Sequence, residues 1–281
     1  MQVVGIYRSE RYSPNMSADD VAIADAVGQL LQSMGHQVDM QSEDHLHLPQ
    51  HLDAVFSMAR HPQTLSLLSQ LERLHITVVN RSVAVACCSR VEFTRKLLQA
   101  QVAMPLTHVI PTDTLHPQFP SYPCWVKRGE GYAEEAGDVC FVETPQQLAR
   151  AVERLRSRAI RTAVVSAHAQ GDLVKFYGVE GTTFFRWNYA SQGHSKFGLE
   201  AVNGKEKGYA FNPERIKLYA DMIAKKLNVP IYGGDVIIDE EGEFWFIDFN
   251  DFPSFSSCRE GAAQAIAKRC EMENVRWKMQ G

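Results

Sequence analysis

Three oxygen-bearing side chains near the C-terminal end of the sequence have a spacing that suits a metal ion. Asp235 begins one predicted strand and Asp248 ends the next, and the turn 240–242 joins the two strands into a hairpin. The two carboxylates can therefore meet at the open end of the hairpin. Asn250 follows Asp248 by two residues on the same strand, so both side chains point to one face of it. Such oxygen ligands suit a hard cation, and Mg²⁺ takes its other ligands from phosphate and water.

The strand that leads to Asp248 is otherwise apolar, with the sequence Phe244-Trp245-Phe246-Ile247. A carboxylate beside such a surface costs free energy unless a metal ion or a cation compensates its charge. An ordinary hairpin with solvated acids at its end is the alternative interpretation, and the hairpin alone leaves this alternative open.

The composition limits the classes of protein that the chain can represent. It has 281 residues, a formal net charge of −4, 45% hydrophobic residues and 22% charged residues, which indicates a globular protein. The mild acidity and the lack of a basic stripe argue against a nucleic-acid partner. The apolar runs, such as 236–238, are too short to span a membrane, and the first residues predict a strand and not a signal peptide.

The cysteines and histidines give no strong metal signal. No Cys-x-x-Cys pair occurs among the six cysteines, a pattern typical of buried thiols in a reducing compartment, so we expect a cytoplasmic protein without structural zinc. His45, His47 and His51 lie close together in the sequence, and we interpret them as part of a polar surface loop.

The first third of the chain alternates strands and helices. Strands are predicted at 3–7, 38–40, 54–58 and 76–79, with helices over 17–34 and 64–74. This alternation predicts a parallel sheet with helices on both faces. Ser17 with Asp20 and Ser89 with Glu92 each form a predicted capping box at the start of a helix.

The regular alternation of predicted strands and helices is interrupted after residue 105. Prolines cluster between 105 and 123, so this stretch reads as a connecting segment. Further strands are predicted at 124–127, 139–142, 163–166, 173–179, 182–189, 234–238 and 244–249, with helices opening at Thr144-Pro145, at Asn212-Pro213 and near Glu260. These later strands are expected to pair mainly antiparallel, which gives an α+β region after an α/β region.

The hairpin resembles the metal-binding element of the ATP-grasp enzymes, a superfamily of carboxylate–amine or carboxylate–thiol ligases that includes the RimK and D-alanine–D-alanine ligase types and some kinases. In that family an acidic residue on one strand and Asp/Glu-x-Asn on the next hold Mg²⁺ on the phosphates of ATP. Asp235, Asp248 and Asn250 match this pattern residue by residue, and the following segment 251–255 resembles the family's proline-containing turn.

The resemblance extends upstream in the same order as in the family. The segment 122–127 resembles the strand that ends in an ATP-binding lysine, here Lys127, and Gly129 and Gly131 resemble the loop that closes over the phosphates. Arg90 stands where the family commonly has its first ATP-binding lysine. Ser166, Ala167 and His168 fall where the family's hinge strand contacts adenine with its backbone, although the usual Gln/Glu is absent there.

The resemblance also implies catalytic residues and a domain arrangement. Lys175 would face the phosphates or the substrate, and Arg186 on the following strand would stabilise the transferred phosphoryl group. The implied domains are an N-terminal parallel α/β domain over 1–88 and an ATP-grasp module of two lobes over 89–170 and 171–281. The implied cofactors are ATP and Mg²⁺, the implied partners are small-molecule carboxylate and amine substrates, and a homodimer is left open.

Three functions stay open at this point. A ligase would activate a substrate carboxylate as an acyl phosphate, and an amine or a thiol would then displace phosphate. A kinase would transfer the phosphoryl group to a hydroxyl; segments 175–179 and 248–253 have counterparts in inositol-phosphate kinases of the superfamily. A polyphosphate substrate would require a cleft with many basic side chains, and the mild acidity of the chain does not indicate such a cleft. The third function is a nucleotide-binding regulatory module without turnover.

Specificity is expected to come from other parts of the chain. Arg8 and Arg60 each follow a predicted parallel strand, where α/β folds place ligands, and either arginine could clamp a carboxylate. Arg11 and the loop 191–212 are further candidates. Neither a Walker P-loop nor a Rossmann glycine fingerprint is present as a competing nucleotide site.

Overall fold

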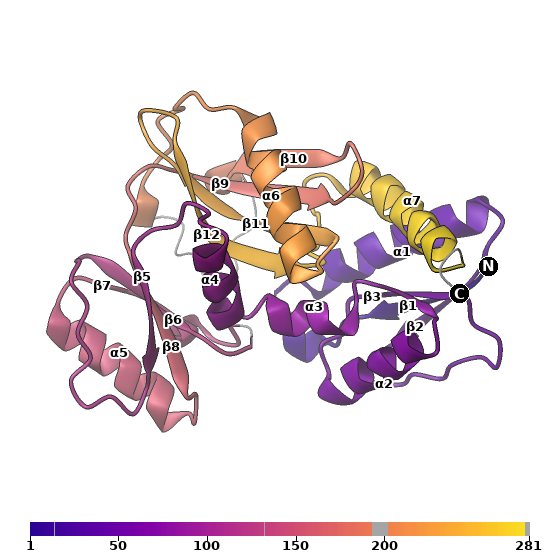
Figure 1. The fold of residues 1–281 in the computed structure, drawn as a ribbon, viewed down its shortest axis with the longest axis horizontal. Helices are drawn as coiled ribbons and strands as arrows, with labels where there is room; N and C mark the ends of the chain where they lie inside the picture. The colour runs from indigo at the N-terminus through magenta and orange to yellow at the C-terminus, as the bar shows by residue number, and fades with distance from the viewer. Residues whose placement is uncertain (14, 132, 193–201, 279–281) are drawn as a thin grey trace.

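The computed structural model describes residues 1–13, 15–131, 133–192 and 202–278. Within these residues the strands form three sheets of four strands each, one parallel and two antiparallel. Figure 1 shows the β5–β8 sheet at one end, the parallel sheet at the other, and the β9–β12 sheet beside both. The mixed α/β and α+β architecture predicted from the sequence is confirmed.

The N-terminal sheet has the order β2-β1-β3-β4, and all of its strand pairs are parallel. Its strands are β1 (Gln2–Tyr7), β2 (Gln37–Ser42), β3 (Ala54–Ser57) and β4 (Thr77–Val79). Helix α1 (Ser17–Ser33) and the C-terminal helix α7 (Arg259–Lys278) pack on one face, and α2 (Pro62–Arg73) packs on the other. The sequence predicted a helix near the C-terminal end but not that it returns to the first sheet.

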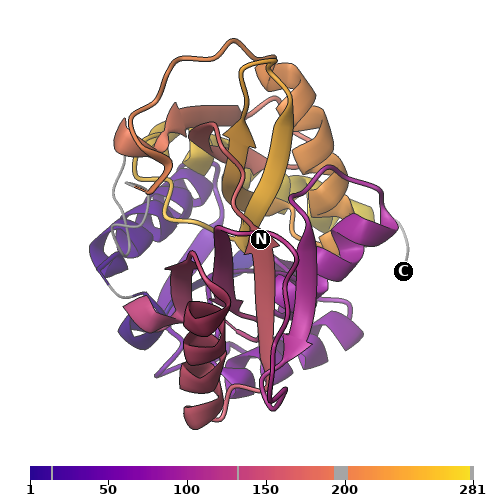
Figure 2. The same ribbon diagram turned by 90° about the vertical axis from the view of Figure 1, so that its left-hand side faces the viewer.

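The middle sheet has the order β5-β8-β6-β7 and is antiparallel. Its strands are β5 (Thr107–Pro111), β6 (Cys124–Arg128), β7 (Val139–Val142) and β8 (Thr162–Ala167), and α5 (Pro145–Ser157) packs on it around a core of its own. Figure 2 shows this lobe facing the viewer.

Strand β5 corrects the prediction that the proline-rich stretch after residue 105 is only a connecting segment. Thr107 and Ile110 are buried and pair with Ser166 and Ala163 on β8. The strand tolerates Pro111 because β5 lies at the edge of the sheet and the proline ends it.

The third sheet has the order β10-β9-β11-β12 and is also antiparallel. Its strands are β9 (Asp172–Val179), β10 (Phe185–Tyr189), β11 (Ile231–Ile238) and β12 (Phe244–Asp251). Helices α3 (Ser82–Cys87), α4 (Arg90–Gln99) and α6 (Pro213–Leu227) complete its core. Buried aromatic rings dominate that core and fix the strands that carry the predicted metal site: Phe176, Tyr232, Phe246 and Phe249.

Four predicted helix starts are confirmed, but the side-chain cap predicted for the first of these helices is wrong. The side chains of Ser89, Thr144 and Asn212 accept backbone N–H groups in the first turns of α4, α5 and α6. The capping box predicted for Ser17 and Asp20 is absent, because Ser17 is already the first residue of α1. The Asp20 carboxylate instead accepts hydrogen bonds from the side chains of two residues that follow β1.

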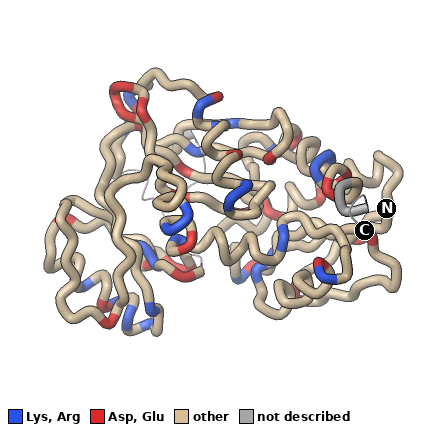
Figure 3. Tube along the Cα trace, in the orientation of Figure 1, with Lys and Arg blue, Asp and Glu red and all other residues tan. Residues whose placement is uncertain are grey.

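The N-terminal sheet and the β9–β12 sheet are joined by polar contacts at their junction. The Asn80 amide donates to the Ile231 carbonyl oxygen at 2.8 Å and accepts from the Ile231 N–H at 2.9 Å. Acidic and basic residues are interspersed along the described chain in Figure 3, in agreement with its small net charge. No helix among the described residues is long and apolar enough to cross a membrane.

Candidate active site

A cavity of about 350 Å³ lies where the three sheets meet. Most of the predicted site residues line it: Arg90, Lys127, Ser166, Ala167, Lys175, Asp235, Asp248 and Asn250, together with Arg8 and Arg60. These residues come from strands of the two antiparallel sheets, from the start of α4 and from the segments that follow β1 and β3. The fold therefore brings together in one place side chains that the sequence could only relate by their order.

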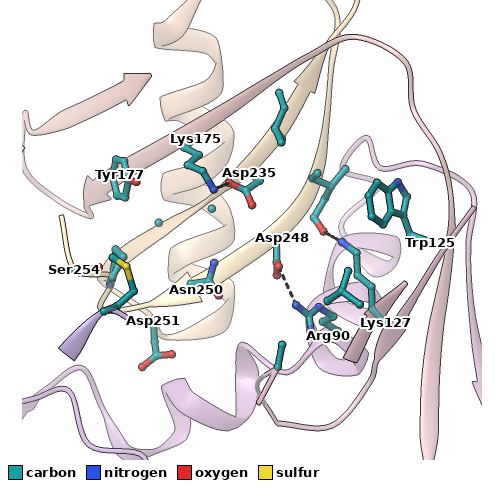
Figure 4. Close-up of a pocket in the computed structure, with 18 of the residues that line it drawn as sticks. Arg90, Trp125, Lys127, Lys175, Tyr177, Asp235, Asp248, Asn250, Asp251 and Ser254 are labelled. Carbon is teal, nitrogen blue, oxygen red and sulfur yellow. Dashed lines mark hydrogen bonds and ion pairs between the residues drawn. The ribbon is translucent and has the colours of Figure 1, made fainter. Parts of the chain in front are cut away.

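The register of the β9–β12 sheet aligns polar side chains across its cavity face. Asp235 lies directly opposite Lys175 on one side and opposite Asp248 on the other. Side chains of directly opposed residues share a face of the sheet, with Cβ atoms about 4.5–5.5 Å apart. Asn250 is the next residue on that face of β12, and it lies opposite Gly233, which presents no side chain. The predicted metal ligands thus converge beside open space (Figure 4).

A β-bulge shapes the same strand pair. The register shifts between Asp235 and Val236, so Ile247 is the extra residue on β12. The Ile247 carbonyl oxygen accepts a hydrogen bond from the Nζ atom of Lys127 at 3.0 Å. The bulge therefore connects the middle sheet to the strand that carries Asp248.

Each predicted metal-binding carboxylate has a cation beside it. Arg90 donates from Nη2 to Asp248 Oδ2 at 3.3 Å, and Lys175 Nζ lies 3.7 Å from Asp235 Oδ1. Burial raises the pKa of Asp248, but Arg90, Lys127 and a backbone N–H outweigh that effect and hold the pKa below its ordinary value. Burial lowers the pKa of Lys127, and Arg90 adds to this lowering, whereas Asp248 and Asp235 oppose it.

At the predicted hinge, which lies at the end of β8, two backbone N–H groups already donate hydrogen bonds to other parts of the protein. The Ala167 N–H donates to the Leu106 carbonyl oxygen at 2.8 Å, and the His168 N–H donates to that of Pro123 at 3.0 Å. Ser166 and Ala167 still line the cavity, as does Ala169, but His168 does not. The His168 ring instead accepts a hydrogen bond from the indole N–H of Trp125.

The two glycines of the predicted phosphate loop differ in their surroundings. Gly129 packs so closely that a Cβ atom would lie 2.8 Å from the Thr162 carbonyl oxygen and from Val91. Gly131 has a φ of +66°, a left-handed conformation that favours glycine. Neither lines the described cavity, whereas Ala133 does.

Arg186, predicted to stabilise the transferred phosphoryl group, is not among the residues that line the cavity. Its guanidinium donates to the Phe185 carbonyl oxygen at 2.9 Å and lies 5.7 Å from the centre of the Phe184 ring. It is opposite Tyr177, so it shares the cavity face of the sheet, but it does not line the cavity itself.

The end of the cavity toward the N-terminal sheet contains two buried ion pairs. Arg8 pairs with Asp20 at 2.8 Å and also donates to the carbonyl oxygens of Met58 and Phe252. Arg60 pairs with Asp251 at 3.2 Å. Both arginines thus lie at the predicted position after parallel strands, and each has its charge balanced by a carboxylate.

Several cavity residues were not singled out from the sequence. Tyr177 and Trp125 could have been found, since each lies two residues from a predicted lysine on the same strand and therefore on the same face. The pKa of Tyr177 is raised to about 12, mainly because its side chain is buried. Asp20 also lines the cavity, and its spacing from Ser17 predicted a helix cap instead.

The loop 191–212 is described in part, and residues 193–201 lie outside the described residues. Asn203 lines the cavity. The Asp172 carboxylate accepts the backbone N–H groups of Lys207, Gly208 and Tyr209 at 2.7, 2.8 and 2.9 Å, and so anchors this end of the loop to β9. Arg11 does not line the cavity and packs on the neighbouring Tyr12 ring.

The histidines at 45, 47 and 51 form no cluster with other metal-binding side chains. No group of three or more His, Cys, Asp or Glu side chains within the described ranges is placed to hold a metal ion. The predicted magnesium site has two carboxylates and one amide, and it stays a prediction.

Solved structures of D-alanine–D-alanine ligases and of a RimK domain ATP-grasp protein resemble the chain over 96–100% of its length. A D-alanine–D-alanine ligase from Bacillus anthracis complexed with ATP has a TM-score of 0.72 at 12% identity and covers 100% of both chains. A D-alanyl-alanine synthetase A from Vibrio cholerae has a TM-score of 0.70 at 12% identity over 98% of both chains. A RimK domain ATP-grasp protein from Sphaerobacter thermophilus has a TM-score of 0.64 at 16% identity over 96% of this chain and 99% of that chain.

No protein-family model matches the chain, and no curated protein matches it by sequence. The structural likeness at these low identities shows the fold. The chain has the fold of these solved structures, in agreement with the resemblance seen in its sequence.

Proposed function

We propose that the protein is an ATP-dependent ligase that joins a carboxylate to an amine or a thiol through an acyl phosphate, with release of ADP and phosphate. The observation that carries the proposal is one cavity in which two carboxylates and an amide face three cations. Asp235, Asp248 and Asn250 would hold Mg²⁺, which would compensate phosphate charge and leave ligand positions for phosphate oxygens.

The cations have a clear part in such a reaction. Phosphoryl transfer needs groups that position the phosphates and spread the charge that builds up on their oxygens. Lys127 on the middle sheet and Arg90 on α4 would hold the α- and β-phosphates, and Lys175 would contact the transferred group. The protein needs no nucleophile, because the substrate carboxylate attacks the γ-phosphate.

We place the substrate at the end of the cavity toward the N-terminal sheet and call it the substrate end. The charges there favour a ligase over a polyphosphate kinase. Arg8 and Arg60 each pair with a buried carboxylate, so this end holds two cations and two anions. A polyanionic substrate would bring negative charge that these paired arginines do not neutralise. A small molecule that carries a carboxylate and an amine is a better electrostatic match.

The proposal includes the cellular compartment in which the enzyme works. All six cysteines are free thiols, which supports the cytoplasmic assignment. The substrates are then small molecules from that compartment.

Binding is tested first, by the shift in melting temperature with ATP and Mg²⁺. A ligand that binds only the folded state raises this temperature in a concentration-dependent way. The wild type is expected to show the shift and Asp248→Asn to lose most of it. Glu240→Gln, on the exposed turn of the same hairpin, is the matched control and should behave as the wild type does.

Turnover is tested next with amino acids, dicarboxylates, amines and inositols. Release of ADP together with phosphate supports the ligase, whereas ADP alone indicates a kinase. ATP binding without ADP release for any substrate would indicate a regulatory module. If ATP with Mg²⁺ does not raise the melting temperature of the wild type, the protein does not bind ATP and the proposed function is wrong.

A further inference from the structure

A second cavity, of about 400 Å³, lies where the N-terminal sheet meets α6, α7 and the β9–β12 sheet. Its walls come from the edge strand β4, from the last turn of α6, from α7 and from the residues that follow β9 and precede β11. Among the described residues, none lines both this cavity and the active-site cavity. Its size is within the range of pockets that hold small molecules. It is therefore a candidate for a second binding site, which we call the junction cavity.

The junction cavity has a buried floor and an exposed mouth. Val78, Val79 and Ala224 line the floor and are buried, and the half-buried Pro230 adds to this apolar surface. Arg269 is also part of the floor, with 9% of its surface exposed. An apolar group of a ligand would bury its own surface against these apolar residues and so stabilise the complex.

Arg269 is fixed by contacts with neighbouring carboxylates and a carbonyl group. Its Nη2 atom pairs with Glu180 Oε2 at 3.0 Å and with the Glu273 carboxylate, and Nη1 donates to the Glu180 carbonyl oxygen at 3.2 Å. The Nε atom is buried and has no hydrogen-bond partner within the described part of the chain. A buried donor without a partner costs free energy, and a ligand oxygen that accepts from it would recover that cost. Because two carboxylates already pair with this guanidinium, a neutral oxygen such as that of an amide suits the position better than a further anion.

The mouth of the junction cavity carries cations and an amide. Arg81, two residues after β4, is exposed and pairs with Glu72 at 3.0 Å. Lys225, in the last turn of α6, is exposed, and no carboxylate of the described residues forms an ion pair with it. Asn228, which ends α6, also lines the cavity. A single carboxylate at the mouth would therefore meet one cation whose charge is not balanced, together with further groups that can donate hydrogen bonds.

We propose that the junction cavity binds a small organic acid that has one carboxylate, an apolar body and one amide oxygen. The carboxylate lies at the mouth with Lys225, the apolar body covers the floor, and the amide oxygen accepts from the Nε atom of Arg269. A nucleotide or another polyanion is a poor match, because Glu180 and Glu273 add negative charge to the walls. The inference concerns a site outside the active-site cavity and does not depend on the proposed function.

A ligand in this cavity would act on the junction between the two sheets. Val79 and Pro230 line the cavity, and the residues that follow them, Asn80 and Ile231, form two hydrogen bonds between the sheets. Ile231 begins β11, the strand that carries Asp235. A ligand that binds only the folded junction stabilises it by mass action. The junction cavity is therefore suited to an effector that stabilises this region, and not to a second substrate.

N-acetylvaline is the probe for this site, because it has one carboxylate, one amide and an apolar side chain. Its binding to the full chain is measured by saturation-transfer NMR, and we expect a Kd of about 5 mM or lower. N-acetylvaline amide lacks the carboxylate and 4-methylpentanoate lacks the amide, so each should bind at least about threefold more weakly. Inorganic tripolyphosphate should not compete with N-acetylvaline, because the walls of the cavity include two carboxylates.

Two variants on α6 test the position of the carboxylate. Lys225→Glu should weaken N-acetylvaline binding at least about fivefold, because it replaces an attracting charge by a repelling one. Lys226→Glu makes the same change in charge at the next residue, which is exposed and does not line the cavity, and it should stay within about twofold of the wild type. Both substitutions are at exposed positions, so both variants should fold, and their melting temperatures check this.

Hydrogen exchange locates the probe, because N-acetylvaline is a carboxylate and could also enter the active-site cavity. The probe should slow backbone exchange in residues 77–81 and 225–231 and leave residues 245–250 unchanged. Protection of 245–250 in place of these segments would show that the probe binds in the active site, and the inference would be wrong. Equal binding of either analogue, competition by tripolyphosphate, equal losses in the two α6 variants or no binding to the wild type would also overturn it. ATP has no part in these measurements, so a wild type that shows no thermal shift with ATP would overturn the proposed function and leave this inference standing.

Discussion

Arg90 and Asp248 are 158 residues apart in the sequence, yet the arginine guanidinium donates to the aspartate carboxylate at 3.3 Å. The pair joins the first turn of α4 to the end of β12. Arg90 thus occupies the Oδ2 atom of Asp248, an oxygen that the proposed metal ion could otherwise use. A nucleotide whose phosphates attract Arg90 would free the carboxylate for the metal.

We predict that Arg90→Gln has opposite effects on two ligands. Mn²⁺ alone, used as a probe for the magnesium site, should bind at least threefold more tightly than to the wild type, because a competing cation is gone. Mg-ATP should bind about tenfold more weakly, because a phosphate partner is gone. Electron paramagnetic resonance of free Mn²⁺ and calorimetry with ATP measure the two effects.

The control for this experiment is Arg95→Gln on the same helix. Arg95 is exposed, and its guanidinium pairs with Glu92 in the first turn of α4 at 2.7 Å. Neither affinity should change in this variant. Parallel losses of Mn²⁺ and ATP affinity in Arg90→Gln would show that Arg90 supports the metal site and does not compete for it.

The sequence predicted most directly which side chains of the β11–β12 hairpin lie together, and their role as metal ligands stays a prediction. Asp235, Asp248 and Asn250 belong to one hairpin, where the two-residue period of a strand fixes which side chains share a face. Arg90 and Lys127 required the resemblance to a family, because only the fold brings them to that hairpin.

The features that the sequence did not predict depend on contacts between distant segments. Helix α7 packs beside α1 although the whole chain separates them. The hydrogen bond from Arg8 to Phe252 spans 244 residues. Asp20 illustrates the ambiguity of a local signal, since its spacing from Ser17 suits a helix cap and its actual partners are Ser13 and Arg8. Local patterns cannot choose between such partners.

A second prediction concerns the anchor of the loop that follows residue 201. Asp172 is buried and its carboxylate accepts three backbone N–H groups. Asp172→Asn replaces one acceptor oxygen by an NH₂ group that faces these donors, so the variant should lose about 1–3 kcal/mol of unfolding free energy. Trypsin should also cleave faster after Lys207, as mass spectrometry of the fragments can show.

Asp113→Asn, an exposed substitution in the segment after β5, is the control for general effects of losing a negative charge. It should match the wild type in both measurements. If Asp172→Asn is cleaved after Lys207 no faster than this control, the carboxylate does not hold the loop.

A third prediction follows from the buried carboxylate next to the middle sheet. Burial of Asp138 raises its pKa, but the Arg158 guanidinium and the N–H groups of Glu134 and Glu135 outweigh burial and hold the pKa below its ordinary value. A carboxyl whose folded-state pKa is lowered stabilises the protein above its unfolded pKa of about 3.8, and this stability is lost as the pH falls through the folded pKa.

The difference in unfolding free energy between the wild type and Asp138→Asn should therefore be constant from pH 7 to about pH 4.5 and shrink only below that. At pH 7 the difference should be about 2–4 kcal/mol, because the substitution leaves Arg158 and two backbone donors poorly paired. Urea titrations at several pH values measure it. A difference that stays constant at all pH values, or that grows as the pH falls, would show that the pKa of Asp138 is not lowered.

The last prediction concerns the ion pair between Arg60 and Asp251, which joins the N-terminal sheet to the end of β12. Both side chains are buried, at 7% and 2% exposed. Removal of one partner leaves a buried charge uncompensated, so Arg60→Met and Asp251→Asn should each destabilise the protein by about 3 kcal/mol. The double variant leaves no such charge, and its loss should fall short of the sum of the single losses by about 1–3 kcal/mol. Urea unfolding of the four proteins forms a double-mutant cycle that measures this coupling. Strictly additive losses would mean that each residue stabilises the junction through its other contacts, and the balanced charge at the substrate end would then not depend on this pair.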